Sequence, residues 1–131
     1  MLPVKLEIIN LGKVEREYRG ITGEYERRIS SLAHVRYISR GRIPKEAIIL
    51  DERGILMSSE EFYELLNRAS KNGEKLIFVI GPPQGLSEEE KRGKTLISLS
   101  KLTVRHELAY LILLEQIYRA LLKMKGTFYE R

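Results

Sequence analysis

Short, nearly continuous apolar runs alternate along the chain with longer segments in which apolar residues recur every three or four positions. The short runs resemble strands covered on both faces, and the longer segments have the spacing of amphipathic helices. We predict strands at 4–11, 34–39, 46–51, 75–80 and 95–100, helices at 13–32, 58–73 and 103–125, and a short polar helix opening at 87–90. This alternation predicts one α/β domain, 1–131, with a parallel sheet flanked by helices.

The segment 103–125 is apolar over more of its circumference than the usual single stripe. One sheet cannot bury so wide an apolar surface, so a second surface has to cover the remainder. In so small a domain we expect a symmetric dimer whose partner supplies that surface. The alternative is a helix wedged between the sheet and neighbouring helices of the same chain.

Composition narrows the classes of partner. The chain has no cysteine, and His34 and His106 are far apart with no acidic cluster beside them, so we expect no metal. No segment approaches a membrane-spanning length and the first residues do not form a signal peptide, so we expect a cytoplasmic protein without a membrane partner. The net charge of +5 suits a polyanionic partner, and basic residues concentrate around "RGRIPK" (40–45). Taken alone, that charge is equally typical of an ordinary solvated surface.

The stretch "FVIGPPQGLS" (78–87) carries two prolines and two glycines directly after a predicted strand. Open α/β sheets bind ligands at the carboxyl ends of their strands, and glycine lets a ligand approach the main chain closely. Two further strand ends, 50–54 and 98–104, have small or apolar residues. "RGKT" (92–95) lacks the upstream glycine of a P-loop, and no G-x-G-x-x-G follows a strand. The three loops predict one site for a flat, uncharged ring; taken singly, each could be a plain strand-to-helix turn.

Two of these stretches carry a resemblance to a known family. "FVIGPPQGLS" and "LISLSKLTVRHELAYLILLEQIYRALLKMKGTFYER" resemble the RlmH family of ribosomal RNA large-subunit methyltransferases, and "LGKVEREYRGITGEYERRI" and "LDERGILMSSEEF" are similar to its corresponding segments. The resemblance implies a SPOUT fold with a deep C-terminal trefoil knot, a homodimer through the C-terminal helix, and S-adenosylmethionine as cofactor. It also implies methylation of N3 of a pseudouridine in 23S ribosomal RNA, on ribosomes.

The resemblance also assigns site residues. The positions that match or adjoin the family's cofactor contacts are Leu50, Gly81, Gly85, Leu86, Leu99, Ser100, Lys101, Leu102, Thr103 and Val104, with Gly54 as a further neighbour. The catalytic end of the family, YHK or YHR, corresponds to Tyr129, Glu130 and Arg131. Glu130 therefore stands where the family has histidine, and a carboxylate of ordinary pKa is a weaker base near neutral pH.

Other departures set the remaining expectations. Pro82 replaces a glycine that could require a positive φ, and Tyr110 replaces an arginine whose charge Arg105 could restore. For His106 we expect a neutral role in capping or pocket structure. The chain is shorter than typical members between 39 and 46, where they carry an extra helical segment. Two alternatives stay open: a SPOUT methyltransferase with another RNA target, and a knotted RNA-binding or ribosome-associated protein that no longer transfers methyl groups.

Overall fold

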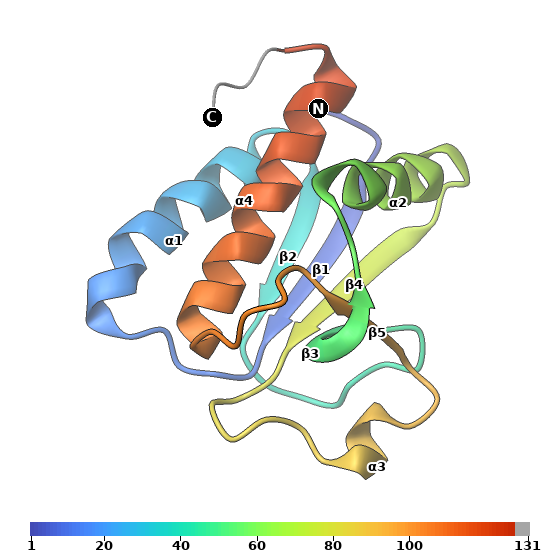
Figure 1. The fold of residues 1–131 in the computed structure, drawn as a ribbon. Helices are drawn as coiled ribbons and strands as arrows, with labels where there is room; N and C mark the ends of the chain where they lie inside the picture. Colours follow the sequence, from blue (N-terminus) through green and yellow to red (C-terminus); the bar gives the residue numbers. More distant parts are fainter. Residues whose placement is uncertain (128–131) are drawn as a thin grey trace.

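The computed structural model describes residues 1–127, which form a five-stranded parallel sheet with helices packed against it (Figure 1). The elements in chain order are β1 (Lys5–Asn10), α1 (Arg16–Ser30), β2 (His34–Ile38), β3 (Ile48–Leu56), α2 (Ser59–Lys71), β4 (Lys75–Ile80), α3 (Glu88–Lys91), β5 (Thr95–Ser98) and α4 (His106–Lys125). The strand order is β2-β1-β4-β3-β5, with every pairing parallel. The predicted α/β class, element order and parallel sheet are confirmed.

Several boundaries differ from the prediction, and two of them bear on the site. β3 does not end at a turn after Leu50: it pairs with β5 on both sides of an irregularity, so that Leu50 and Ile55 both lie opposite Ile97. The expected strand-to-helix turn at 50–54 is therefore wrong, because a bulge carries the strand onward. α4 begins three residues later than predicted, since Arg105 still has extended backbone and caps the helix.

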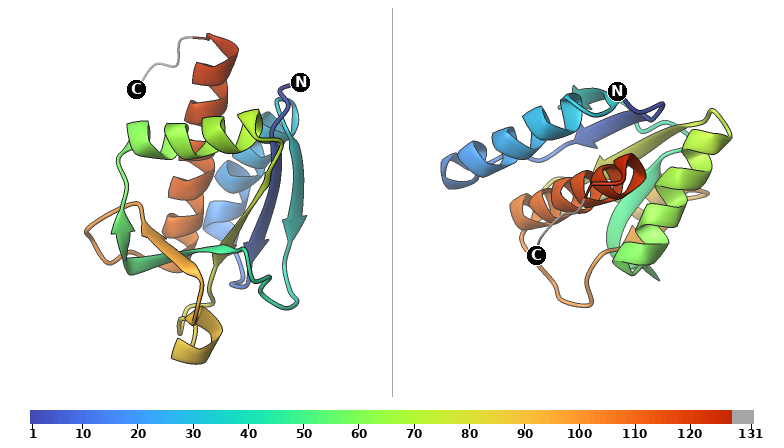
Figure 2. Two further views of the ribbon diagram at one scale, coloured as in Figure 1. Left: turned by 90° about the vertical axis from the view of Figure 1, so that its right-hand side faces the viewer. Right: turned by 90° about the horizontal axis from the view of Figure 1, so that it is seen from above.

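One face of the sheet is covered by α1, α2 and α4, as the two views of Figure 2 show. Alternate strand residues point into this layer, which is why Ile8 of β1 and Phe78 of β4 have no exposed surface. The Phe62 ring of α2 lies 5.5 Å from the Phe78 ring, centroid to centroid. These contacts form the main hydrophobic core.

α4 crosses this layer between α1 and α2, in contact with both and with β4. Its buried residues are Glu107, Tyr110, Leu113, Leu114, Ile117, Ala120, Leu121 and Leu122. Leu108, Leu111 and Ile112 stay partly exposed. Neighbouring helices of the same chain therefore cover most of the apolar surface that led us to expect a dimer, and the dimer remains a prediction.

The second face of the sheet has a thinner cover. A smaller apolar cluster there contains Ile9, Ile77 and Val79, packed against Ile43 of the linker 39–47 and Leu86. The linker joins β2 to β3 without a helix. It is the segment in which the sequence is shorter than expected. Within residues 1–127, no helix is long and apolar enough to cross a membrane.

Candidate active site

A cavity of about 450 Å³ opens at the carboxyl ends of β4 and β5, beside the bulge of β3. Three segments line it, 49–53 of β3 and the stretches 80–86 and 97–104, together with Lys91 of α3 and three residues of α4: His106, Ala109 and Ile112. Its volume is in the range of small-molecule sites, and its lining mixes apolar side chains with main chain and a few polar groups. The three loops singled out from the sequence thus meet at one site.

Nine of the ten predicted cofactor residues line this cavity: Leu50, Gly81, Gly85, Leu86, Leu99, Ser100, Leu102, Thr103 and Val104. Lys101 is exposed and is not part of the lining, and Gly54 is not part of it either. The three predicted catalytic residues, Tyr129, Glu130 and Arg131, lie outside the described residues. Contact of any of these residues with a cofactor stays a prediction.

The segment 80–86, which we call the Gly-Pro loop, does not have the strain at Pro82 that the sequence led us to expect. The Gly85 amide donates a hydrogen bond to the Pro82 carbonyl at 2.8 Å, and Gly85 has φ of 81°, which suits glycine. In residues 1–127 only glycines have positive φ, so Pro82 causes no strain of the kind that its replacement of glycine suggested. A Cβ on Gly81 would lie 3.0 Å from Leu86 Cγ, so this glycine makes room for Leu86.

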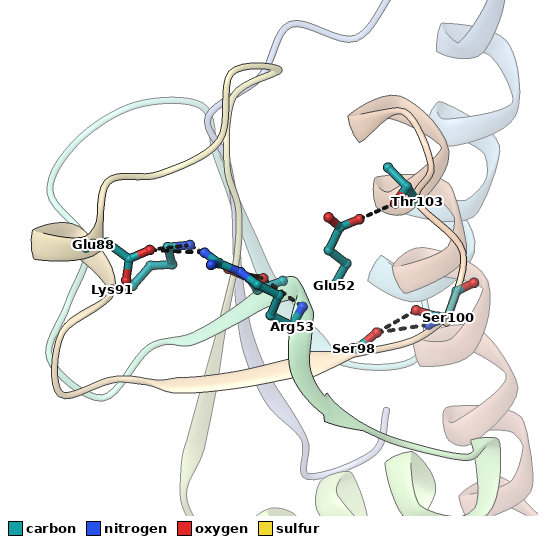
Figure 3. A network of polar contacts seen from close by, with 8 residues as sticks. Glu52, Arg53, Glu88, Lys91, Ser98, Ser100 and Thr103 are labelled. Carbon is teal, nitrogen blue, oxygen red and sulfur yellow. Dashed lines mark hydrogen bonds and ion pairs between the residues drawn. The ribbon is translucent and has the colours of Figure 1, made fainter.

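The loop after β5 is folded onto itself by serine hydroxyls. Ser98 Oγ donates to the Ser100 carbonyl at 2.6 Å, and Ser100 Oγ accepts from the Leu102 amide at 3.0 Å. Thr103 Oγ1 then donates to Glu52 Oε2 at 2.6 Å, across the cavity mouth (Figure 3). This last bond ties the loop before α4 to the bulge of β3.

A second polar contact ties α3 to the same bulge (Figure 3). Lys91 is 9% exposed, although it lies in a helix of polar sequence, and its Nζ donates to Asp51 Oδ2 at 2.8 Å. Burial opposes ionisation of Asp51, but the Lys91 ammonium and the Arg53 amide outweigh it and hold the pKa of the carboxyl below its ordinary value of 3.8. Arg53 also pairs with Glu88 at 3.0 Å. These contacts tie α3, which follows the Gly-Pro loop, to the bulge of β3.

His106 links the start of α4 to the loop after β1. Its Nε2 lies 2.9 Å from the Lys13 carbonyl oxygen, and its Nδ1 lies 3.0 Å from the carboxylate of buried Glu107. The ring covers Gly12 so closely that a Cβ there would lie 2.3 Å from His106 Cδ2. This geometry is that of a structural tether at the cavity wall, which agrees with the expected role in pocket structure, and the expected neutral state of the ring stays a prediction.

Tyr110, which stands at an arginine position of the family, points away from the cavity. Its hydroxyl donates to the Glu26 carboxylate between α1 and α4. Burial and that carboxylate raise the pKa of the Tyr110 phenol above its ordinary value. Arg105 pairs with Glu107 at 3.2 Å. The bond of Tyr110 joins α4 to α1, whereas the pair of Arg105 lies within the start of α4, so the tyrosine alters helix packing behind the site.

The sequence missed several cavity residues. Glu52 lies in the segment 50–54 that the sequence singled out, but no role was assigned to it, and Lys91, Ala109 and Ile112 lie outside the three predicted segments. No local signal marks them, because each reaches the site through contacts between distant segments. Within residues 1–127, no group of three or more histidine, aspartate or glutamate side chains could hold a metal ion.

Comparison with known proteins gives the family. Residues 36–130 match the family model described as "Predicted SPOUT methyltransferase". The chain is 34% identical to ribosomal RNA large subunit methyltransferase H of Thermus thermophilus, over 98% of this chain and 99% of the relative. It is 36% identical to the protein of that name in Coprothermobacter proteolyticus, over 98% of this chain and 100% of the relative.

Solved structures show the same fold. A methylase family protein from Neisseria gonorrhoeae superposes with a TM-score of 0.58 at 13% identity, covering 89% of this chain and 83% of the other. A methyltransferase from Legionella pneumophila, solved with its bound cofactor S-adenosylmethionine, gives 0.52 at 15% identity, covering 90% and 67%. The chain therefore belongs to the SPOUT methyltransferase family, among the proteins named ribosomal RNA large subunit methyltransferase H.

Proposed function

We propose that this protein is an S-adenosylmethionine-dependent methyltransferase that modifies N3 of a pseudouridine in 23S ribosomal RNA, on ribosomes. The observation that carries the proposal is the cavity between the bulge of β3 and the carboxyl ends of β4 and β5, lined by nine of the ten residues that match or adjoin the family's cofactor contacts. Membership of the family named above supplies the reaction and the substrate class.

The lining fits the chemistry of this cofactor. Leu50, Leu86 and Leu99 provide apolar walls for an adenine ring, and the main chain of 98–104 offers donors and acceptors for its polar edge. Glu52 and Thr103 lie at the same cavity and could take hydroxyl groups of a ribose. When bound, S-adenosylmethionine supplies an electrophilic methyl group on sulfur. The task of the chain is to align that methyl with the attacking nitrogen and to exclude water.

Removal of the N3 proton requires an acceptor close to the base. Glu130 occupies the position of the family histidine, so we assign its carboxylate as the acceptor of the N3 proton. Tyr129 and Arg131 then position the nucleotide. A carboxylate of ordinary pKa accepts this proton less readily than an imidazole near neutral pH. The assignment therefore predicts a slow enzyme at neutral pH.

A homodimer and a C-terminal trefoil knot complete the proposal. The partly exposed apolar residues Leu108, Leu111 and Ile112 lie along one side of α4, and Ile112 also lines the cavity. A partner chain packed there would lie next to the site and bring its own C-terminal residues to it. Light scattering on the purified protein should give the mass of two chains, and a single-chain mass would contradict the dimer.

Methyl transfer from labelled S-adenosylmethionine tests the function, with 70S ribosomes and free 23S ribosomal RNA as substrates. We expect transfer to ribosomes, a loss of at least tenfold with Glu130→Gln, and a gain in rate at neutral pH with Glu130→His. Cofactor binding without transfer to either substrate would favour another RNA target. Neither binding nor transfer by a folded protein would favour an RNA-binding protein that has lost the reaction.

A further inference from the structure

Among the helices of residues 1–127, none covers one half of the second face of the sheet. This half lies over β2, β1 and β4 and is bordered by the linker that joins β2 to β3. We call it the linker face; its charged and titratable residues are Lys5, Glu7, His34, Arg36 and Lys75 on the strands and Arg40, Arg42, Lys45 and Glu46 on the linker. The strand residues share one side because alternate residues of neighbouring parallel strands point the same way.

Most of the protein's surplus positive charge lies on the linker face. It holds six of the 23 lysines and arginines and only two of the 18 acidic residues, a surplus of four where the whole chain has a net charge of +5. On the other half of the same side, the segment 88–94 carries three glutamates and three basic residues, which balance. The surplus is therefore local, and it differs from charge spread evenly over a surface.

The strand cations are held in place with their charged groups facing solvent. The Glu7 carboxylate, 10% exposed, accepts from Lys75 Nζ at 2.8 Å and from Arg36 Nη1 at 3.4 Å. The side chains of Arg36 and Lys75 remain 75% and 47% exposed. A cavity of about 470 Å³ at the amino ends of these strands is lined by the same residues, together with Lys5 and His34. Glu7 thus orients two cations beside a hollow in the surface.

The linker adds three more cations at the other end of this face. Gly41 lies between Arg40 and Arg42 with φ of 125°, a turn conformation that suits glycine. Arg40, Arg42 and Lys45 are exposed, and among the described residues none of them makes an ion pair or side-chain hydrogen bond. Because β2 runs in the same direction as β3, β4 and β5, the linker leaves it at the edge of the sheet where the cofactor cavity opens.

We propose that the linker face binds the phosphate backbone of the RNA substrate and leads it toward the cavity. The strand cations Lys5, Arg36 and Lys75 lie toward the amino ends of β1, β2 and β4, and the linker cations follow the carboxyl end of β2. The two groups are separated by roughly the length of β2, a five-residue strand about 16 Å long, which suits several successive phosphates of a linear polyanion. Charge complementarity favours RNA over a second copy of this chain, because two linker faces would repel each other. The inference rests on the proposed function for its choice of RNA.

The test is the triple variant Arg40→Gln, Arg42→Gln, Lys45→Gln, which breaks no contact within the described residues. Its matched control, Arg19→Gln, Arg68→Gln, Lys71→Gln, removes two arginines and one lysine from exposed positions on α1 and α2. Both variants are measured for affinity to 23S ribosomal RNA over a range of salt concentrations, for KM and kcat on 70S ribosomes, and for affinity to S-adenosylmethionine.

The linker variant should bind the RNA at least tenfold more weakly at about 0.1 M salt. Its log affinity should depend on log salt with a slope smaller by about 0.7 to 0.9 for each phosphate that the variant no longer neutralises. KM on ribosomes should rise, while kcat and cofactor affinity stay unchanged. The control should change RNA affinity less than twofold.

Unchanged RNA affinity in the linker variant, or an equal loss of affinity in the control, would overturn the proposal. A changed oligomeric state of the linker variant in light scattering would also overturn it, because it would assign the face to a second copy of the chain. If wild type methylates ribosomes and the linker variant does so with unchanged KM, the linker face is refuted and the proposed function stands. If wild type binds RNA without methylating it, the proposed function fails. The ratio of RNA affinities between wild type and the linker variant then still tests whether the linker face binds RNA.

Discussion

The core under the three helices and the rim of the cofactor cavity are stabilised by different interactions. By the rim we mean the bulge of β3, α3 and the loop 98–104. In the core, apolar side chains such as Phe62, Phe78 and Leu114 are almost fully buried. At the rim, polar bonds join segments that are distant in the chain, such as Thr103 with Glu52. Burial of apolar surface contributes most of the stability of a fold, whereas a partly exposed hydrogen bond contributes little but fixes geometry. Core changes should therefore alter unfolding, and rim changes should alter ligand affinity.

Phe62→Ala should give the largest loss of stability. Phe62 is 1% exposed and packs on Phe78, so truncation leaves a cavity and should lower the free energy of unfolding by about 3–5 kcal/mol. Glu64→Ala, on the exposed side of the same helix, should change it by less than about 0.5 kcal/mol. Urea unfolding measures both. Similar losses in the two variants would show that the helix layer is not the main core.

Lys91→Met tests whether the rim contributes stability through a buried ion pair. Loss of the bond to Asp51 should cost about 1.5–3 kcal/mol near pH 6. Because the pKa of Asp51 is lowered in the folded protein, the stabilisation is present above its ordinary value of 3.8 and is lost as the pH falls below it. The gap in unfolding free energy between wild type and Lys91→Met should therefore narrow as the pH falls through 3.8 and below. A constant gap would mean that Lys91 acts through packing alone.

Two glycine substitutions compare the rim with a helix surface. A Cβ on Gly54 would lie 2.5 Å from the Leu96 carbonyl carbon of β5, so Gly54→Ala should displace that strand and lower the unfolding free energy by about 1–3 kcal/mol. It should also weaken cofactor binding, because β5 leads into the loop 98–104. Gly20→Ala, in α1 with open space around it, should raise the unfolding free energy by about 0.5–1 kcal/mol. A harmless Gly54→Ala would refute the close approach of β3 and β5.

The bond between Glu52 and Thr103 should show the smallest effect on stability and a clear effect on the ligand. Both residues are exposed, so Glu52→Ala should change the free energy of unfolding by about 0.5–1.5 kcal/mol. Without this bond the loop before α4 is less fixed, and affinity for S-adenosylmethionine should fall several-fold. A double-mutant cycle of Glu52→Ala and Thr103→Val separates the coupling between these two side chains from contacts that each makes with the cofactor. Additive effects of the two substitutions on affinity would contradict the coupling.

The sequence predicted the core much better than the rim. Apolar spacing located eight of the nine elements in residues 1–127, and the capping boxes at Ser58 and Ser87 marked the starts of α2 and α3, which the structure confirms. The bulge in β3 was missed, because its polar residues resemble a turn while their pairing depends on β5. Burial of Lys91 was missed for the same reason: its partner Asp51 is 40 residues away. Local patterns determine elements, whereas the rim depends on contacts between distant segments.

Calorimetric titration of the purified protein with S-adenosylmethionine tests the central claim most directly. The account predicts saturable binding in the micromolar range by wild type and its loss in Gly81→Trp, whose indole would displace Leu86 and fill part of the cavity. Circular dichroism on both proteins establishes that they are folded. Absence of binding by folded wild type up to millimolar cofactor would contradict the assignment of this cavity as the methyl-donor site.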